Sequence, residues 1–375
     1  MEMKRILVTG GAGFIGSHTV DLLLSRGYQV RVFDNLSPPV HRSGQLPDYC
    51  AEQAEFIAGD VREKADWERA LEGIDAVFHL AAYQDYLPDF SKFFHVNAVG
   101  TALLYEVIIE HGFPIRKVVL ASSQASYGEG KYLCATHGVQ YPPPRTTAQL
   151  ERQDWEPQCP LCGAQLEAVE TDEKRVNPHN SYAMSKYTQE MIALVLGQRY
   201  EIPSVALRYS IVQGARQSFR NAYSGVLRIF AMQMLAGERP TAYEDGEQIR
   251  DYVYVGDVAR ANLLALEDAR ADLRTFNVGG GRRVTVNQFA RTMAEAIGRP
   301  ELTPVCRGEY RFGDTRHISS DIGQLGELGW QPVGTVEQSV AEYLEWAQQQ
   351  PDFGDFATRA RKKMRQLGTV RGGWR

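Results

Sequence analysis

Long apolar runs are missing from this 375-residue chain. A helix that crosses a bilayer needs about 18 or more consecutive apolar residues, and no stretch approaches that length. The N-terminus also lacks room for a signal peptide, because Lys4 and Arg5 lead directly into an apolar strand pattern. These absences predict a cytoplasmic protein that does not bind membranes.

The chain also has no large excess of positive or negative charge. The chain has 41 Lys and Arg against 46 Asp and Glu, a net charge of −5 with neutral histidines. This mild acidity argues against nonspecific binding to nucleic acid or to a membrane surface, because such binding needs clustered positive charge. Only the segment after Pro351 is basic, and we interpret it as a solvated helix and loop rather than a binding arm.

Cysteine is scarce, and the five residues cannot all pair with one another. An odd number of cysteines is typical of a reducing compartment. The chain also lacks internal repeats and low-complexity segments, and its hydrophobic content of 43% predicts a globular protein with a large core. The cysteines are Cys50, Cys134, Cys159, Cys162 and Cys306.

Short apolar runs alternate with amphipathic stretches through the first 120 residues. The runs predict strands that are buried on both faces, at Arg5–Val8, Gln29–Phe33, Glu55–Ile57, Ala76–Leu80 and Lys117–Leu120. The stretches between them predict helices at Phe14–Ser25, Lys64–Leu71 and Phe90–His111. This alternation predicts an α/β fold of the Rossmann type, a doubly wound parallel sheet with right-handed crossovers.

The alternating pattern breaks between residues 128 and 178, where Gly, Pro and Cys replace the periodicity. We interpret this segment as an insertion. Beyond it the patterns predict helices at Ser181–Gln198, Ala222–Ala236, Val255–Glu267, Thr285–Ile297 and Val336–Gln348, and strands at Ser204–Arg208, Ile249–Val253 and Thr275–Val278. The predicted units are a dinucleotide-binding Rossmann domain (1–127 and 179–210, with parts of 249–280), the 128–178 insertion, a smaller C-terminal α/β substrate-binding domain (211–248 and 281–350) and a basic tail (351–375).

A glycine-rich turn directly follows the first predicted strand. Its G-x-G-x-x-G string opens a helix, where backbone N–H groups and the helix dipole can bind a pyrophosphate. Asp34 ends the second strand, 18 residues after Gly16, where its carboxylate can accept ribose hydroxyls and would repel a 2′-phosphate. The pattern therefore favours NAD over NADP. The alternative is that the glycines only form a tight turn and that Asp34 is a solvated carboxylate at the end of a strand. The candidate cofactor contacts here are Gly10, Gly13, Phe14, Ile15, Gly16, Asp34, Asn35, Asp60 and Val61, with Asp60 placed to reach the adenine amine.

A second group of polar residues provides candidate catalytic side chains. Tyr182 and Lys186 lie four residues apart on a predicted helix and therefore share one face. Such a pair is more often structural, but Ser123 ends the fifth strand, and ligands of open α/β sheets bind at the carboxyl ends of strands. Tyrosine is a poor base at pH 7 until a nearby ammonium group and the nicotinamide cation stabilise its phenolate. Lys186 can supply the first of these two charges.

With both groups of residues present, the sequence resembles the extended short-chain dehydrogenase/reductase family. Within it, the sequence is similar to the NAD-dependent nucleotide-sugar epimerases and dehydratases, which include proteins like UDP-glucose 4-epimerase. The resemblance covers about residues 4 to 348. It implies that Tyr182 is the acid/base, that Lys186 keeps it ionised and binds the nicotinamide ribose, and that Ser123 binds a sugar hydroxyl. It also implies a homodimer through the helices Phe90–His111 and Ser181–Gln198. The motifs that carry it are T-G-G-x-G-x-x-G with Asp34, His79-Leu80-Ala81-Ala82, Asn97, Ser123, Tyr182 and Lys186, of which Leu80, Ala81, Ala82 and Asn97 are further cofactor contacts.

The two residues after Ser123 indicate which reaction is catalysed. The sugar 4,6-dehydratases that this motif resembles carry Asp-Glu there, whereas this chain has Gln124 and Ala125, which cannot transfer a proton. The sequence therefore favours reversible hydride chemistry on tightly bound NAD, as in a C4 epimerase that forms a transient 4-keto sugar. A C2 epimerase, a 4-keto-sugar reductase and a non-catalytic NAD-binding scaffold remain alternatives.

Candidate substrate contacts lie farther along the chain. Arg250 and the Arg311–Asp314 segment resemble the clamps that family members place on the substrate diphosphate and nucleotide, and guanidinium groups bind phosphates bidentately. Surface arginines that pair with local acids are the alternative. Tyr83 and Gln84 lie where relatives contact the sugar, as do Ser123 and Gln124. Where the family usually reads R-Y-F-N, this chain has Ile211 in place of the amide, so the sequence leaves the sugar open.

The insertion carries a candidate metal site. Cys134 and His137 form a C-x2-H pair, and Cys159 and Cys162 form a C-x2-C pair 21 residues later. This pattern predicts a structural zinc with four protein ligands, against the alternatives of free thiols in two turns or a redox pair. It resembles an insertion in bacterial proteins similar to dTDP-L-rhamnose 4-epimerase. We hypothesise that the insertion forms a lid or a wall of the sugar pocket.

Overall fold

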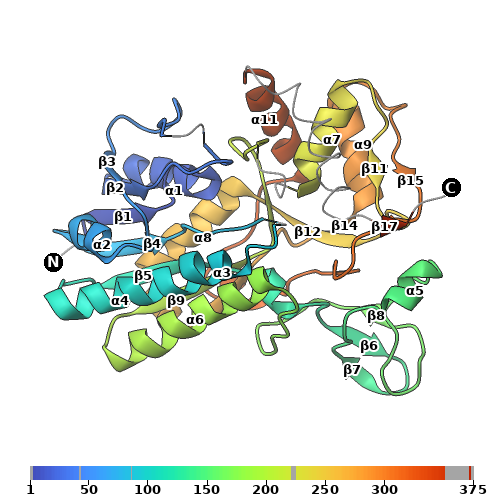
Figure 1. Cartoon of the computed structure of the whole chain (residues 1–375), viewed down its shortest axis with the longest axis horizontal. Helices are drawn as coiled ribbons and strands as arrows, with labels where there is room; N and C mark the ends of the chain where they lie inside the picture. The colour runs from blue at the N-terminus through green and yellow to red at the C-terminus, as the bar shows by residue number, and fades with distance from the viewer. Residues whose placement is uncertain (1–2, 42–43, 86, 221–224, 351–370, 373–375) are drawn as a thin grey trace.

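The computed structural model describes residues 3–41, 44–85, 87–220, 225–350 and 371–372 (Figure 1). Its centre is a seven-stranded parallel sheet with the strand order β13-β9-β5-β4-β1-β2-β3. The strands are β1 (Arg5–Thr9), β2 (Gln29–Asp34), β3 (Glu55–Ala58), β4 (Ala76–His79), β5 (Lys117–Ser123), β9 (Ser204–Tyr209) and β13 (Thr275–Val278).

Helices cover both faces of this sheet, so successive residues of a strand enter different cores. Ile6 and Val8 of β1 pack with helices α1 (Phe14–Ser25) and α8 (Val255–Glu267). Leu7 between them packs toward α2 (Lys64–Leu71), α4 (Gly100–His111) and α6 (Ser181–Arg199). Burial on both faces explains why the strands read as continuous apolar runs. The predicted Rossmann-type fold with a parallel sheet is confirmed.

The remaining elements form a third apolar core beside the sheet. It contains α7 (Gly225–Leu235), α9 (Val286–Ala296) and α11 (Val336–Gln348), which pack on β12 (Ile249–Tyr254). β12 lies between β10 (Ile211–Gln213) and β14 (Arg283–Thr285). The smaller elements are β11 (Thr241–Ala242), which pairs with β15 (Val305–Cys306), and the short helices η3 (Ala269–Ala271) and α10 (Gly323–Gly326).

The 128–178 insertion forms a small unit that Figure 1 shows at one end of the molecule. Its three-stranded sheet has the order β7-β6-β8, and its core consists of Tyr132, Cys134, Cys159 and Leu166. The 3-10 helix η2 (Gln124–Tyr127) leads into it from β5. Its elements are β6 (Tyr132–Cys134), β7 (Gly138–Gln140), α5 (Thr147–Glu151) and β8 (Glu167–Ala168).

One predicted helix is divided in the structure, and another lies partly outside the described residues. The predicted helix Phe90–His111 consists of α3 (Phe90–Phe93), a π-helical turn η1 (Phe94–Val99) and α4. The predicted helix Ala222–Ala236 is described only from Gly225, because 221–224 lie outside the described residues. Most of the predicted basic tail also lies outside them, and β17 (Arg371–Gly372) within it pairs with β16 (Glu309–Tyr310).

One described helical segment, Phe90–His111, is long and apolar enough to cross a membrane by length and composition alone. Half of its most apolar window is buried inside the protein, where α4 packs between α2 and α6. A core helix meets the same criteria, so this packing explains its apolar character.

Candidate active site

A cavity of about 710 Å³ opens at the carboxyl ends of the parallel strands. This is the edge at which ligands bind in open α/β sheets. The cavity brings together nearly all the predicted cofactor, catalytic and substrate residues from distant parts of the chain. These lining residues are Gly10, Gly13, Phe14, Ile15, Gly16, Asp34, Asn35, Asp60, Val61, Leu80, Ala81, Ala82, Tyr83, Gln84, Ser123, Gln124, Tyr182, Lys186, Arg250, Arg311 and Asp314.

The glycine-rich turn between β1 and α1 needs glycine for steric reasons. A Cβ atom on Gly16 would lie 2.1 Å from the carbonyl oxygen of Gly10. Gly10 itself has a φ of 66°, and a Cβ there would lie 2.9 Å from the Cα of Ala81. The backbone can therefore approach a ligand closely at this point.

Asp34 ends β2 beside this turn. Its Oδ2 accepts a hydrogen bond from Ala12 N (3.2 Å), and its Oδ1 accepts one from Leu36 N (2.9 Å). Burial raises the pKa of the carboxyl group, and the nearby His41 opposes that rise. These backbone bonds fix the carboxylate at the cavity wall, where a ribose hydroxyl can donate to it.

Asp60 follows β3 and lies on the same wall. Its carboxylate accepts hydrogen bonds from Asn35 Nδ2 (3.0 Å) and from Arg62 Nη2 (2.6 Å). Burial raises its pKa, but the bonds from Arg62 outweigh burial and lower the pKa to about 2. Asp60 is therefore an ionised acceptor at neutral pH.

The predicted catalytic pair lies in the first two turns of α6. Asn180 caps this helix by accepting a bond from Ala183 N (2.9 Å), which places Tyr182 at the cavity. Burial raises the pKa of Tyr182 to about 12, although a hydrogen bond with Ser123 lowers it in part. Burial also lowers the pKa of Lys186 to about 7, and its Nζ donates to Gln189. Burial therefore shifts both pKa values toward the neutral side chain, because desolvation disfavours the charged form of each group.

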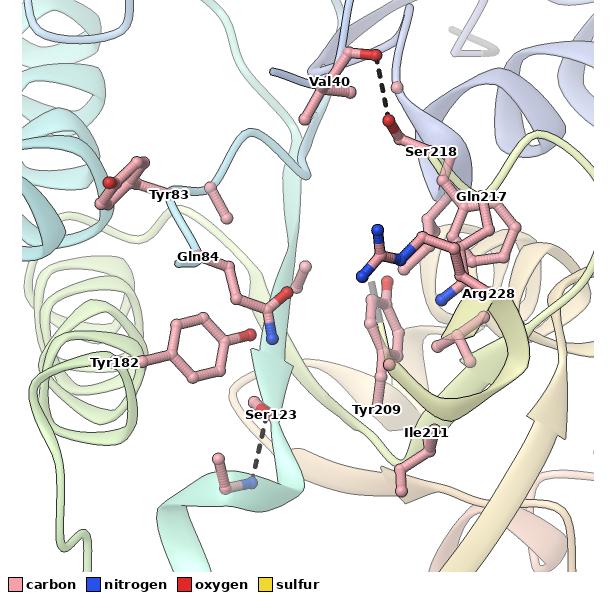
Figure 2. A pocket seen from close by; sticks show the side chains of 18 of the residues that line it. Val40, Tyr83, Gln84, Ser123, Tyr182, Tyr209, Ile211, Gln217, Ser218 and Arg228 are labelled. Carbon is pink, nitrogen blue, oxygen red and sulfur yellow. Dashed lines mark hydrogen bonds between the residues drawn. The ribbon is translucent and has the colours of Figure 1, made fainter. Parts of the chain in front are cut away.

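Figure 2 shows how the side chains face the cavity. Tyr182 and Gln84 point into it from one side, and Ser123 lies next to them at the end of β5. Ser123 Oγ accepts a hydrogen bond from Ala125 N (3.1 Å), which fixes the hydroxyl within the cavity. Arg228 and Ile211 lie on the opposite side.

Gln124 has an unsatisfied acceptor in the cavity. The residue is 8% exposed, and its Oε1 atom has no hydrogen-bond partner among the described residues. A buried polar atom without a partner is costly, so a ligand donor is the natural partner for this oxygen.

Asn97 is the one predicted cofactor residue that does not belong to the described lining. Its Oδ1 accepts from Tyr83 N (2.8 Å), and its Nδ2 donates to Tyr83 O (3.1 Å) and to Ser185 Oγ (2.9 Å). Asn97 thus joins the backbone of a lining residue to α6.

The two predicted diphosphate-binding arginines both line the cavity and are both held by neighbours. Arg250 donates to the carbonyl oxygens of Ile249 (2.9 Å), Thr315 (2.9 Å) and Arg316 (3.0 Å). Arg311 Nε donates to Asp314 Oδ2 (2.7 Å). The alternative of pairing with a local acid is thus realised for Arg311, but at the cavity wall rather than on an open surface.

Arg228 is a lining residue that the sequence reasoning missed. Its side chain is buried, and its Nη1 donates to Phe219 O (3.0 Å). Arg228 is the single charged residue of the largely apolar helix Gly225–Leu235, and this is the signal that could have identified it, because arginine is seldom buried without a role.

The departure from the family pattern at Ser210 and Ile211 has a structural explanation. Ser210 is buried and donates to Asp251 Oδ2 (2.8 Å), which also accepts from Ser320 N (3.0 Å). Ile211 lines the cavity instead of the amide expected there. An apolar surface therefore replaces a polar contact on this wall.

The four residues of the predicted metal site converge in the insertion. Their ligand atoms all lie within 4.8 Å of one another. The Sγ atoms of Cys134 and Cys162 are 3.8 Å apart, and His137 Nδ1 is 3.7 Å from the Sγ atoms of Cys134 and Cys159. None of the five cysteines, all of them described residues, forms a disulfide bond.

The described lining contains no residue between 126 and 181, although every residue in that range is described. The insertion therefore does not form a wall of the cavity in this structure, contrary to our hypothesis. Its short sheet packs against the segment around His317 instead, through the bond of Tyr132 to the His317 backbone.

Comparison with known proteins agrees with this site. The family model of the NAD dependent epimerase/dehydratase family matches residues 6–148 and 160–279. The dTDP-L-rhamnose 4-epimerase of Burkholderia thailandensis is 34% identical over 94% of this chain and 97% of its own length.

Two solved UDP-glucose 4-epimerases are also similar. That of Thermotoga maritima, with UDP-glucose, has a TM-score of 0.74 and 32% identity, and it covers 92% of this chain and 98% of its own. That of Thermus thermophilus, in complex with NAD, has a TM-score of 0.70 and 30% identity over 91% of this chain and 98% of its own. The chain therefore belongs to the NAD dependent epimerase/dehydratase family.

Proposed function

We propose that the protein is an NAD-dependent nucleotide-sugar epimerase that inverts C4 through a transient 4-keto sugar. One observation carries this proposal. Ser123, Tyr182 and Lys186 line the same cavity as the glycine-rich turn and Asp34, while positions 124 and 125 hold no acid. The relatives named as 4-epimerases support the same reaction.

The cavity fits NAD at its glycine-rich end. Gly10 and Gly16 allow the backbone to approach a pyrophosphate, and the N–H groups at the start of α1 can bind it. Asp34 would accept the ribose hydroxyls. Bound there, NAD would supply a hydride acceptor and donor for the sugar carbon.

Tyr182 would move the proton that accompanies this hydride. Its pKa of about 12 means that the phenol keeps its proton at neutral pH in the protein alone. A positive charge near the ring would lower this pKa and make Tyr182 a base when oxidised cofactor is present. Ser123 would orient the sugar hydroxyl toward Tyr182, and Lys186 would stabilise the phenolate.

Gln124 and Ala125 set the reaction apart from dehydration. Elimination of water needs a further acid/base next to the sugar, and neither side chain can transfer a proton. The partnerless Oε1 of Gln124 would accept a hydrogen bond from a ligand and only position it. The site therefore supports simple oxidation and re-reduction.

We further propose that Arg250, Arg311 and the buried Arg228 anchor the substrate diphosphate. Together they place three guanidinium groups on the cavity wall. Anchoring at the nucleotide lets the flat keto sugar turn over and present its other face. Because Ile211 offers an apolar surface, we propose dTDP-L-rhamnose, a deoxy sugar nucleotide, ahead of UDP-glucose as substrate.

Turnover of dTDP-L-rhamnose and UDP-glucose by the purified protein tests this proposal. We expect inversion at C4, and we expect Tyr182→Phe to lower kcat by a factor of about 100 or more while NAD stays bound. Tyr187→Phe, on the same helix but outside the described lining, is the matched control and should keep its activity. Equal activity of Y182F and Y187F would contradict the assigned role, and a wild-type protein that binds NAD but turns over neither sugar would favour a scaffold.

We also propose that Cys134, His137, Cys159 and Cys162 hold a structural zinc ion. Around tetrahedral zinc with Zn–S distances of about 2.3 Å, two thiolate sulfurs lie about 3.8 Å apart. The separation of 3.8 Å between Cys134 and Cys162 fits this geometry and is far longer than a disulfide bond. With four protein ligands the ion would have no open position, so it would stabilise the insertion. Such thiolates persist in a reducing compartment such as the cytoplasm.

We propose a homodimer through α4 and α6, which lie side by side in Figure 1. These helices and the adjoining η1 carry large apolar side chains that are exposed in the single chain. The exposed residues are Val99, Ile109, Met184, Met191 and Val195. Exposed apolar side chains that cluster on packed helices are typical of a protein interface.

A further inference from the structure

The insertion contacts the cavity indirectly, through residues 311–318. This segment contributes Arg311, Asp314, Thr315 and Ile318 to the lining, whereas the insertion contributes no described residue between 128 and 178. The contacts between the two segments are polar and partly buried, and they connect residues more than 150 positions apart in the sequence.

Three hydrogen bonds join the segment to the start and middle of the insertion, two through the segment's backbone and one through the Thr315 side chain. Arg145 Nη2 donates to Asp314 O (2.7 Å), and Glu129 Oε2 accepts from Arg316 N (2.9 Å). Thr315 Oγ1 donates to Gly128 O (2.9 Å). These bonds fix the chain on both sides of Thr315.

Glu156, in the loop after α5, adds a second set of contacts. Its Oε1 accepts from Arg316 Nε (2.9 Å) and Nη2 (2.7 Å), and its Oε2 lies 2.8 Å from His317 Nε2. Ile249 N donates to Nδ1 of His317 (3.0 Å), so in the neutral ring Nε2 carries the proton and donates to Glu156. One carboxylate thus accepts from two neighbouring side chains of the segment.

The same stretch of backbone positions Arg250. The carbonyl oxygens of Thr315 and Arg316 accept the bonds from its guanidinium group. A shift of this backbone would therefore move Arg250, and it would also move Arg311 and Asp314 within the segment.

We propose, building on the epimerase assignment, that the insertion positions the substrate-binding arginines, with Glu156 and Arg145 as positioning residues that hold residues 311–318 against the cavity. The insertion thereby sets the affinity for the nucleotide sugar without touching it. The proposed zinc ion would support this positioning, because it would keep in place the loops that carry Glu156 and Arg145.

Glu156→Gln tests the proposal in the full-length protein with its NAD. A glutamine side chain has an NH2 donor in place of one carboxylate oxygen, so its NH2 group would face an N–H of either Arg316 or His317 and could not accept from it. The Glu156 side chain is 25% exposed, and glutamine has nearly the same size as glutamate, so E156Q should fold. Asp172→Asn is the matched control, because Asp172 pairs with Lys131 (2.7 Å) inside the insertion and has no bond to residues 311–318 among those described.

We expect E156Q to raise KM for the nucleotide sugar about tenfold with kcat within about twofold of wild type, because anchoring is lost while the chemistry is intact. NAD content should not change. Hydrogen exchange of the amides at 311–318 should be about tenfold faster in E156Q than in D172N. An unchanged KM, or exchange no faster than in D172N, would overturn the proposal. If wild type turns over neither dTDP-L-rhamnose nor UDP-glucose, the proposed function fails, and exchange alone decides this inference.

Discussion

Lys186 and Tyr182 show that residue type and spacing do not determine protonation. The motif identified both side chains, and the structure places both at the cavity. The opposite shifts of their pKa values come from burial, which depends on packing that the sequence does not display. Arg228 was missed for the same reason, because only the folded chain brings α7 to the cavity.

Lys186→Met should stabilise the NAD-free protein. The folded-state pKa of Lys186 is about 7, and an unfolded lysine titrates near 10.4, so between these values the unfolded chain binds more protons. Wild-type stability should therefore rise as the pH increases from 7 to 10, and K186M should lack this rise. We expect K186M to be more stable than wild type by on the order of 4 kcal/mol at pH 7 and by only about 1 kcal/mol at pH 9.5.

Urea unfolding of the NAD-free proteins at both pH values measures this effect. Lys174→Met, at an exposed position, is the control and should change little. If NAD-free K186M is less stable than NAD-free wild type at pH 7, this result contradicts the claim that burial of the charged Lys186 amine destabilises the folded protein.

At the level of elements, periodic segments were predicted well and the insertion was not. The helices Phe14–Ser25, Lys64–Leu71, Val255–Glu267 and Val336–Gln348 begin and end as predicted, because each has one apolar face that meets a core. The insertion has strands of two or three residues, which are too short to show a period. Its cysteine spacing predicted the cluster of side chains but not where the unit packs.

Metal analysis of the purified protein tests the zinc proposal. We expect about one zinc ion per chain, and we expect Cys162→Ser to lose it and to unfold the insertion at a lower temperature, because the ion ties two loops together. Cys306→Ser replaces an exposed cysteine outside the cluster and should keep the metal. Clearly less than one zinc ion per wild-type chain would rule out the site.

For the whole molecule, the parallel sheet and the position of the cavity at the carboxyl ends of its strands followed from the alternation of strands and helices. The path of the chain between the three apolar cores could not be predicted in this way. Contacts such as that between Arg145 and Glu244 join residues that no local sequence pattern relates. The same limit applies to assembly, because exposure of apolar side chains on α4 and α6 is known only from the folded chain.

The homodimer proposal predicts a mass in solution of twice the 42.1 kDa of one chain. Val195→Asp should yield monomers, because it places a charge among exposed apolar side chains of α6. Val333→Asp is the matched control, since Val333 is also exposed but lies outside α4 and α6. Light scattering after size exclusion distinguishes the outcomes, and a wild-type protein of monomer mass would contradict the proposal.

The central claim is that C4 is inverted by removal and return of the same hydride on enzyme-bound NAD. The most direct test is to bring dTDP-L-rhamnose or UDP-glucose to equilibrium with the wild-type protein in deuterated water and to analyse the product by NMR. We predict an inverted C4 that carries no deuterium. Incorporation of solvent deuterium at the inverted carbon would contradict the account, because it would show that inversion proceeds through loss of a proton.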